Sequence, residues 1–254
     1  PIFEEGLQDI LQEVLAKKRI AFTGDLGQAL SAAQIAIIAV GTPSLQDGGV
    51  DLSQVKKVAE TISELADTPL TVVMKSTVPP GTGISLYKRY FSKAKVPIHY
   101  VSNPEFLREG KAVWDWYNTD RIVIGSASME AEQLIKELYS DIDAPKKFMD
   151  ITSAEMVKYA SNAFLATKIS FINEIANLCE RVKADIDLVA PAIGMDKRIG
   201  PDFLQAGLGY GGSCFPKDTK GLNYISSFNG YNFNVLKAVI EVNTLQRVIT
   251  VRKL

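Results

Sequence analysis

The fold is decided by a short apolar run, Ile35-Ala36-Ile37-Ile38-Ala39-Val40, which leads directly into Gly41-Thr42-Pro43. Six apolar residues that end at a glycine and a proline are typical of a strand buried on both faces of a sheet. Comparable runs predict strands at 19–22, 35–40, 70–74, 98–101, 121–124 and 147–149. The stretches between them carry apolar residues at helical spacing, as in 7–15 and 55–65. This alternation predicts an α/β fold with a parallel sheet wrapped by helices.

The pattern changes after Asp150 to nearly uninterrupted helix. Thr152 or Ser153 is the predicted N-cap, and the apolar periodicity then continues to about Ala184 without glycine or proline. A helix of about thirty residues is long for a globular protein and is typical of a dimer spine. Shorter helices are predicted at 185–193, at 219–227 and from 233 onward, with an ordered loop at 201–216. We therefore expect two domains, 1–150 and 151–254, of which the second is all-α.

Composition excludes several classes of function. The chain has 254 residues and a formal net charge of -1, which gives no case for binding nucleic acid or a membrane surface. No apolar run reaches the roughly 18 residues that a membrane span needs. Two cysteines without a pairing pattern favour a reducing compartment, so a cytoplasmic protein is expected. We expect no metal site.

The chemistry concentrates in the run 208–218, which reads Leu-Gly-Tyr-Gly-Gly-Ser-Cys-Phe-Pro-Lys-Asp. Its three glycines let the backbone adopt positive φ and approach a ligand closely. A helix that begins near Phe215 would place Cys214 at its positive end, which suits a nucleophilic thiolate. Lys217 and Asp218 follow within one turn. Taken alone, the run is equally compatible with a small buried thiol on a glycine-rich turn.

Five further motifs occur in a fixed order before the cysteine run, at 40–43, 75–82, 102–110, 155–164 and 198–204. Together the six motifs span nearly the whole chain, and the chain resembles the UDP-glucose/GDP-mannose dehydrogenase family. The resemblance implies a Rossmann-like domain followed by a central helical dimerisation domain, NAD as cofactor, and a homodimer. It also implies that the first βαβ unit is missing, because no G-x-G-x-x-G precedes a helix here.

The resemblance implies roles for six catalytic residues. Cys214 would add to an aldehyde intermediate and later carry a thioester. Lys158 would stabilise the developing oxyanion, and Asn162, one helical turn further on, would donate a hydrogen bond to the reacting sugar oxygen. Asp218 would hold a water together with Lys158, and Glu105 would act as general base. The sixth residue, which would lie beside the nicotinamide, is Thr77.

The family also implies residues for binding. Those expected at the cofactor are Val40, Gly41, Thr42, Pro43, Ser76, Thr77, Glu109 and Lys217. Those expected at the nucleotide sugar are Glu105, Phe106, Leu107, Lys158, Asn162, Arg198, Phe203, Leu204, Tyr210 and Gly211. Arg198 matches an arginine that family members insert into the neighbouring subunit's site.

Details of the cysteine run favour UDP-glucose over GDP-mannose or other nucleotide sugars. Two other classes stay open. The 3-hydroxyacid dehydrogenases share a Lys-x-x-x-Asn pair but perform one oxidation without a thiol, and an inactive dimerisation fragment is also compatible with the sequence. Bland interpretations hold for the remaining candidates: His99 has no role, Cys179 is buried and inert, and Trp114 and Trp116 belong to the core or an interface.

Overall fold

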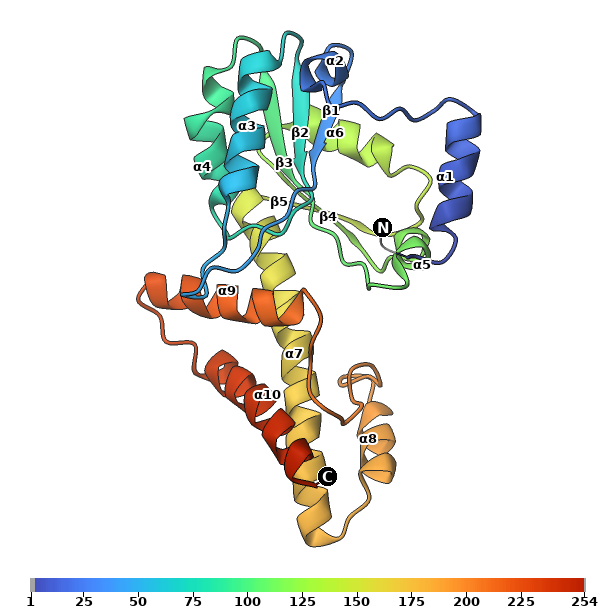
Figure 1. The fold of residues 1–254 in the computed structure, drawn as a ribbon, viewed down its shortest axis with the longest axis vertical. Coiled ribbons are helices and arrows are strands. Elements are labelled where there is room, and N and C mark those ends of the chain that lie inside the picture. Colours follow the sequence, from blue (N-terminus) through green and yellow to red (C-terminus); the bar gives the residue numbers. More distant parts are fainter. Residues whose placement is uncertain (1–2, 254) are drawn as a thin grey trace. The chain divides into compact units, whose positions relative to one another are not determined.

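The structure is a computed structural model that describes residues 3–253, and these residues form two compact units (Figure 1). Unit 1 consists of the described residues up to Thr42 together with Leu52–Lys158. Unit 2 consists of Pro43–Asp51 and the described residues from Tyr159 onward. Helix α7 (Ile151–Val182) begins in unit 1 and continues in unit 2.

Unit 1 is built on a five-stranded sheet with strands in chain order. The strands are β1 (Ile35–Ile38), β2 (Leu70–Met74), β3 (Ile98–Ser102), β4 (Ile122–Ser126) and β5 (Lys146–Met149). The expected parallel pairing is confirmed for β1 with β2, β2 with β3, and β4 with β5. It is wrong for β3 and β4, which pair antiparallel. A parallel pair needs a connection that crosses the sheet, whereas the segment 103–121 stays at the end where β3 finishes.

Helices cover both faces of this sheet, as Figure 1 shows. On β2, Val72 and Met74 pack with α3 (Ser53–Leu65) and α4 (Thr82–Arg89), and a short turn, η1 (Phe91–Lys93), completes that side. Val73 points the other way and packs with α6 (Met129–Leu138). This alternation follows from the two-residue period of a strand, and it explains why the strands have near-continuous apolar sequences.

The beginning of the chain departs from the prediction. Residues 19–22 were expected to form a strand, but they pair with no other strand in the described part of the chain, and Ile20 and Phe22 are exposed. An extended segment becomes a strand only when a neighbour accepts its hydrogen bonds. The preceding helix α1 (Leu7–Ala16) likewise has no buried residue, and the short α2 (Leu26–Leu30) follows.

The long helix is confirmed, with one correction at its start. Helix α7 runs for 32 residues, from Ile151 to Val182. The carboxylate of Asp150 accepts a hydrogen bond from the backbone N–H of Ser153 at 2.9 Å and another from the Ser153 hydroxyl at 2.6 Å. The capping side chain is therefore that of Asp150, and the predicted caps Thr152 and Ser153 lie inside the helix.

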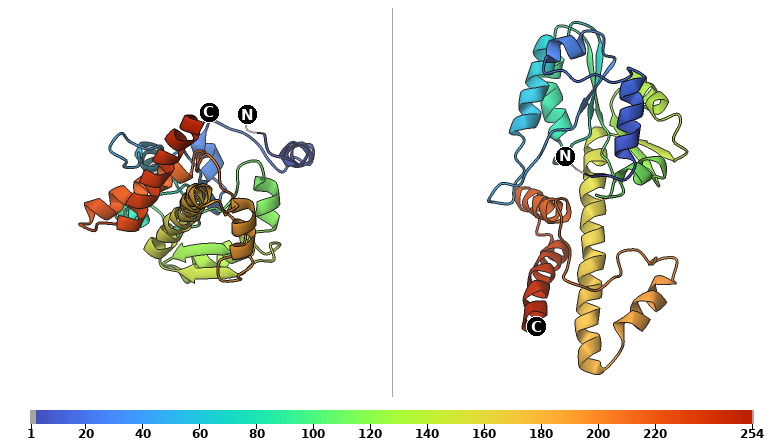
Figure 2. Two further views of the ribbon diagram at one scale, coloured as in Figure 1. Left: turned by 90° about the horizontal axis from the view of Figure 1, so that it is seen from below. Right: turned by 45° about the vertical axis from the view of Figure 1, so that its right-hand side comes forward.

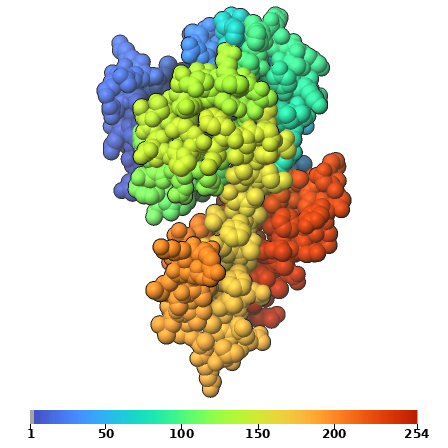
Figure 3. Space-filling model, turned by 180° about the vertical axis from the view of Figure 1, so that it is seen from behind, coloured from blue at the N-terminus to red at the C-terminus, as the bar shows by residue number. Residues whose placement is uncertain are grey.

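Unit 2 packs three further helices around its part of α7, which are α8 (Ile186–Gly194), α9 (Phe215–Phe228) and α10 (Asn234–Lys253). Figures 1 and 2 show α8 and α10 on opposite sides of α7, and Figure 3 shows the same helices from behind. The core has two small clusters, one around Tyr159 and Leu236 and the other around Ala166 and Tyr210.

Among residues 3–253, no helix combines the length and the apolar character that crossing a membrane requires.

Candidate active site

The loops that follow β1, β2 and β3 carry three of the six motifs. These strands run parallel, so their carboxyl ends lie at one edge of the sheet, where open α/β sheets bind ligands. The Ser76 hydroxyl donates a hydrogen bond to the backbone carbonyl of Val40 at 2.6 Å, which ties the first two loops together. Thr42 is buried and Thr77 is partly exposed. The structure therefore brings the predicted cofactor residues of unit 1 together at this edge.

An ion pair joins the third loop to α7. Lys158 is only 4% exposed, and its ammonium donates to the Glu105 carboxylate at 2.9 Å. The second carboxylate oxygen of Glu105 accepts the backbone N–H of Leu107 at 2.5 Å. The ring of Phe106 lies 5.4 Å from the Lys158 nitrogen, within range of a cation–π contact. A buried lysine needs such partners, because an unpaired buried charge is costly.

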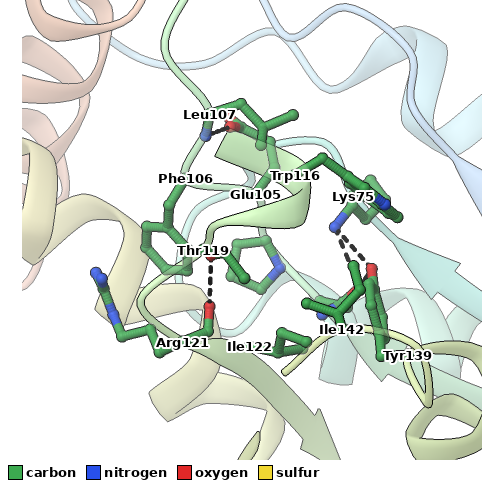
Figure 4. A pocket seen from close by; sticks show the side chains of 12 residues that line it. Lys75, Glu105, Phe106, Leu107, Trp116, Thr119, Arg121, Ile122, Tyr139 and Ile142 are labelled. Carbon is green, nitrogen blue, oxygen red and sulfur yellow. Dashed lines mark hydrogen bonds between the residues drawn. The ribbon is translucent and has the colours of Figure 1, made fainter. Parts of the chain in front are cut away.

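A pocket in unit 1 opens beside this pair (Figure 4). Glu105, Phe106 and Leu107 line one side, and Lys75 and Trp116 line another. Of the two expected places for the tryptophans, the core is excluded, since Trp116 is 37% and Trp114 is 58% exposed, and an interface stays a prediction. The connection 103–121 stays at the sheet's end and carries both tryptophans there on α5 (Ala112–Tyr117).

Lys75 is a site residue that the sequence analysis missed. Its ammonium donates to the side-chain oxygen Oδ1 of Asn103 at 3.2 Å and to the Tyr139 hydroxyl at 3.1 Å. Burial lowers the pKa of Lys75 to about 8, which outweighs the opposing effect of the nearby Glu105. The available signal was its place in the sequence, since Lys75 is the first residue after β2 and directly precedes Ser76.

In unit 2, Asp218 is the centre of a buried polar cluster. Its carboxylate is 1% exposed and accepts a hydrogen bond from the Asn162 amide at 2.6 Å. Its other oxygen accepts from the Lys217 ammonium at 2.5 Å. The structure thus brings together three of the predicted residues, and it directs Lys217, expected at the cofactor pyrophosphate, towards Asp218.

Cys214 occupies the N-cap position of α9, which meets the condition considered for the thiol. The predicted bounds are wrong at this end, because the helix begins at Phe215, four residues before the expected start at 219, and the loop ends before 216. The Asp218 N–H donates to the Cys214 carbonyl at 2.8 Å, so the helix forms from this residue. The thiol is exposed, and the Ser213 hydroxyl lies 3.7 Å from its sulfur. A thiol at a helix N-terminus lies at the positive end of the helix dipole. The bland interpretation, a small buried thiol, is wrong for Cys214, whereas the other cysteine, Cys179, is buried as expected.

The cysteine loop needs its glycines. Gly209 and Gly212 have φ values of 96° and 73°, in the region that glycine alone adopts readily. A Cβ on Gly209 would lie 2.4 Å from the Asn243 side-chain oxygen. That oxygen accepts the Tyr210 N–H at 2.7 Å, so the close approach of the loop to α10 serves a hydrogen bond.

The other predicted substrate residues differ in exposure. Arg198 is highly exposed and pairs with Asp196, whereas Leu204 and Tyr210 are buried in unit 2. Tyr210 packs edge to face on Phe215 and has a packing position in the core, so its contact with a nucleotide stays a prediction. Phe203 has a φ of 64° and also packs on Phe215. The remaining substrate residue, Gly211, is exposed, and so is Glu109, which is expected at the cofactor.

Comparisons with known proteins agree with these motifs. Residues 1–143 match the NAD binding domain of the UDP-glucose/GDP-mannose dehydrogenase family, and residues 152–245 match its central domain. The chain is 50% identical to the UDP-glucose 6-dehydrogenase TuaD of Bacillus subtilis, over all of this chain and 56% of that protein. It is 43% identical to the UDP-glucose 6-dehydrogenase of Pseudomonas aeruginosa, over 97% of this chain and 56% of the relative.

A solved UDP-glucose dehydrogenase from Pyrobaculum islandicum superimposes with a TM-score of 0.93 at 42% identity, over 96% of this chain and 58% of that one. The chain therefore spans a little over half the length of these relatives. With both of its parts matched in order, the chain belongs to the UDP-glucose/GDP-mannose dehydrogenase family.

Proposed function

We propose that this chain carries the catalytic residues for an NAD-dependent, four-electron oxidation of UDP-glucose to UDP-glucuronate. The observation that carries the proposal is the exposed Cys214 thiol at the N-terminus of α9, on the same helix as the buried Asp218. A single oxidation of an alcohol needs no nucleophile, whereas a second oxidation requires the aldehyde to be held. The names of the relatives support UDP-glucose as the substrate.

The residues of unit 1 fit a dinucleotide. Gly41 has no atom closer than 4.0 Å to the position of an added Cβ, so the backbone at the end of β1 is open to a ligand. Val40, Thr42, Ser76 and Thr77 would hold the cofactor at that edge. The family resemblance adds Pro43, Glu109 and Lys217 as further proposed contacts, of which Lys217 is paired with Asp218 here. NAD, when bound, would accept hydride from the substrate carbon.

The chain's own groups account for the remaining chemistry. The side-chain nitrogens of Lys158, which is paired with Glu105, and of Asn162 would act as donors to an oxygen that gains negative charge. The Cys214 sulfur would add to the aldehyde carbon, and the carbonyl oxygen would become the hydroxyl of a thiohemiacetal. After the second oxidation the same carbon is a thioester. Glu105 would take one proton from the water that attacks the thioester, and the C–S bond would break to give the carboxylic acid and the Cys214 thiolate, which takes up the acid's proton as the carboxylate leaves.

The rival is a single oxidation of the 3-hydroxyacid type. The two readings differ in stoichiometry, because four-electron oxidation yields two NADH for each UDP-glucose consumed and a single oxidation yields one. We would measure this ratio on the chain and on a version joined to the segments that the longer relatives have in addition. A ratio of one, with the aldehyde as product, would favour the rival.

We also propose a homodimer formed through α7. Phe164, Phe171 and Leu178 follow one another at intervals of seven residues and are 66%, 54% and 53% exposed. Residues at this spacing lie along one face of a helix, and a row of exposed large apolar side chains is typical of an interface.

The test is the molar mass in solution by light scattering. Phe171→Lys should shift the protein towards the monomer, whereas Phe228→Lys, at an even more exposed phenylalanine on α9, should not. An unchanged mass for Phe171→Lys would remove α7 from the interface.

A further inference from the structure

A buried glutamate on α7 accepts hydrogen bonds from the backbone at the beginning of α4. Glu155 is 2% exposed, and its two carboxylate oxygens accept the backbone N–H groups of Gly81 and Gly83 at 2.6 and 2.8 Å. Gly81 is the N-cap residue of α4, and a glycine has no side chain that could cap the helix. The first N–H groups of a helix have no partner within the helix, so a carboxylate there satisfies them and also matches the helix dipole.

These hydrogen bonds depend on a close approach of the beginning of α4 to α7 and β3. A Cβ added to Gly83 would lie 2.2 Å from the ring of Tyr100 on β3 and 2.7 Å from the Ile151 side chain. Gly81 has a φ of 91°, in the region that favours glycine. The two glycines therefore let the start of α4 reach α7, and any side chain at position 83 would push the two helices apart.

The segment fixed in this way carries a predicted catalytic residue. Thr77 lies four residues before Gly81, and the intervening loop is closed by a hydrogen bond from the Thr82 N–H to the Pro79 carbonyl at 3.0 Å. Three residues after Glu155, the same helix presents Lys158 to Glu105. Two neighbouring turns of α7 thus hold the loops that follow β2 and β3.

We propose that Glu155 is a positioning residue, whose carboxylate fixes the start of α4 and thereby the loop of Thr77 relative to Lys158 and Glu105. The catalytic meaning of this position rests on the proposed function, since Thr77 is a predicted site residue. The physical claim, that Glu155 orders residues 76–84, does not depend on any substrate or cofactor. The proposed function and the claim that Glu155 orders residues 76–84 can therefore be disproved independently of each other.

The environment of Glu155 adds a signature. Burial raises the pKa of the carboxyl to about 7, against the opposing effect of the two N–H groups. The titratable group that faces Glu155 is Tyr100 on β3. Burial and the charge of Glu155 raise the pKa of Tyr100 well above its ordinary value. Between pH 5 and 8 the buried carboxyl group of Glu155 loses its proton. The resulting charge is better solvated when the loop is open and the carboxylate is in water, so opening of the loop becomes easier as pH rises.

The test is amide hydrogen exchange, read by mass spectrometry on this chain without ligands. Glu155→Ala should reduce the protection of residues 81–84 by about tenfold or more, because it leaves two N–H groups without an acceptor. Glu4→Ala is the matched control, since the Glu4 carboxylate holds Gly110 and Ala112 by their N–H groups, both at 2.9 Å, elsewhere in unit 1. It should loosen residues 110–112 and leave 76–84 unchanged.

Two further arms keep the test decisive if Glu155→Ala does not fold. In the unsubstituted chain, protection of residues 76–84, corrected for intrinsic exchange, should fall from pH 5 to pH 8. In Glu155→Gln, which keeps one acceptor and cannot ionise, the protection of the same residues should not vary with pH. Protection in the unsubstituted chain that does not change with pH, or a loss in the variants that spreads evenly over unit 1, would overturn the proposal and leave Glu155 an ordinary buried residue.

Discussion

Two loops carry predicted catalytic residues, and they are held in chemically different ways. The loop of Thr77 in unit 1 is anchored by the ionisable carboxylate of Glu155. The loop of Cys214 in unit 2 is anchored by neutral amides: Asn173 accepts the Gly207 N–H, and Gln246 donates to the Gly207 carbonyl. Asn243 both accepts from and donates to the backbone of Tyr210. An amide side chain does not titrate, so we expect pH to change the conformational order of the Thr77 loop and not that of the Cys214 loop.

The largest expected effect is on the rate of the reaction, and it comes from removing the Cys214 thiol of the second loop. Cys214→Ser should lower the rate of UDP-glucuronate formation by about a thousandfold or more, because loss of a nucleophile removes a whole reaction route. The measurement is acid product and NADH yield per UDP-glucose. Cys179→Ser is the control, since this thiol is buried, and it should keep the ratio of two NADH. Unaltered turnover by Cys214→Ser would show that the exposed thiol serves no chemistry.

The next prediction tests the ionisable anchor. The folded pKa of Glu155 is about 7 and its ordinary value is 4.5, so its contribution to stability is complete below pH 4.5 and is lost as pH rises through 7. The free energy of unfolding of unit 1 should fall by up to about 3 kcal/mol across this window. Both tryptophans lie in unit 1, so their fluorescence during urea unfolding reports on it. Glu155→Gln should remove this slope, and a slope that persists would assign it to another group.

The matching prediction for the amide anchor has no pH term. Asn243 is 6% exposed, and Asn243→Ala removes the acceptor of the Tyr210 N–H and leaves the Tyr210 carbonyl only the Arg247 guanidinium, at 3.4 Å. Unit 2 should lose about 2 kcal/mol of stability, by the same amount at pH 5 and pH 8. Far-UV circular dichroism during urea unfolding gives the value. Thr244→Ala, one position along α10 and exposed, should change it by less than about 0.5 kcal/mol.

The smallest effect sharpens the comparison within unit 1. Ser76→Ala removes the hydrogen bond to the Val40 carbonyl and should cost about 1 kcal/mol, read by tryptophan fluorescence. Ser92→Ala removes an exposed hydrogen bond at 3.2 Å and should cost less. An equal cost for both substitutions would show that the link between the first two loops adds no stability.

Local patterns predicted most of the fold, and long-range contacts account for the errors. The strands at 70–74 and 98–102 are buried apolar runs, which the sequence displays directly. The direction of β4 depends on where the preceding connection lies, and no local pattern encodes that. Residues 19–22 have a strand composition but no partner strand in the described part of the chain.

The site divides in the same way. The neighbouring glycines and the proline allowed Cys214 to be placed at the start of a helix, but they left open whether its thiol is exposed, as it is, or buried. The pairing of Lys158 with Glu105, 53 residues away, is invisible to periodicity, and only the family resemblance put both in one site. The hydrogen bonds of Glu155 could not be predicted, because its partners lie 72 and 74 residues earlier in the chain.

The most direct test of the central claim is capture of the thioester. The protein would be incubated with NAD and the 6-aldehyde of UDP-glucose, quenched in acid during turnover, and digested for mass spectrometry. The account predicts a UDP-glucuronyl adduct on the peptide that contains Cys214 and none on the peptide that contains Cys179. Formation of UDP-glucuronate with Cys214 unmodified throughout, and at an undiminished rate in Cys214→Ser, would contradict it.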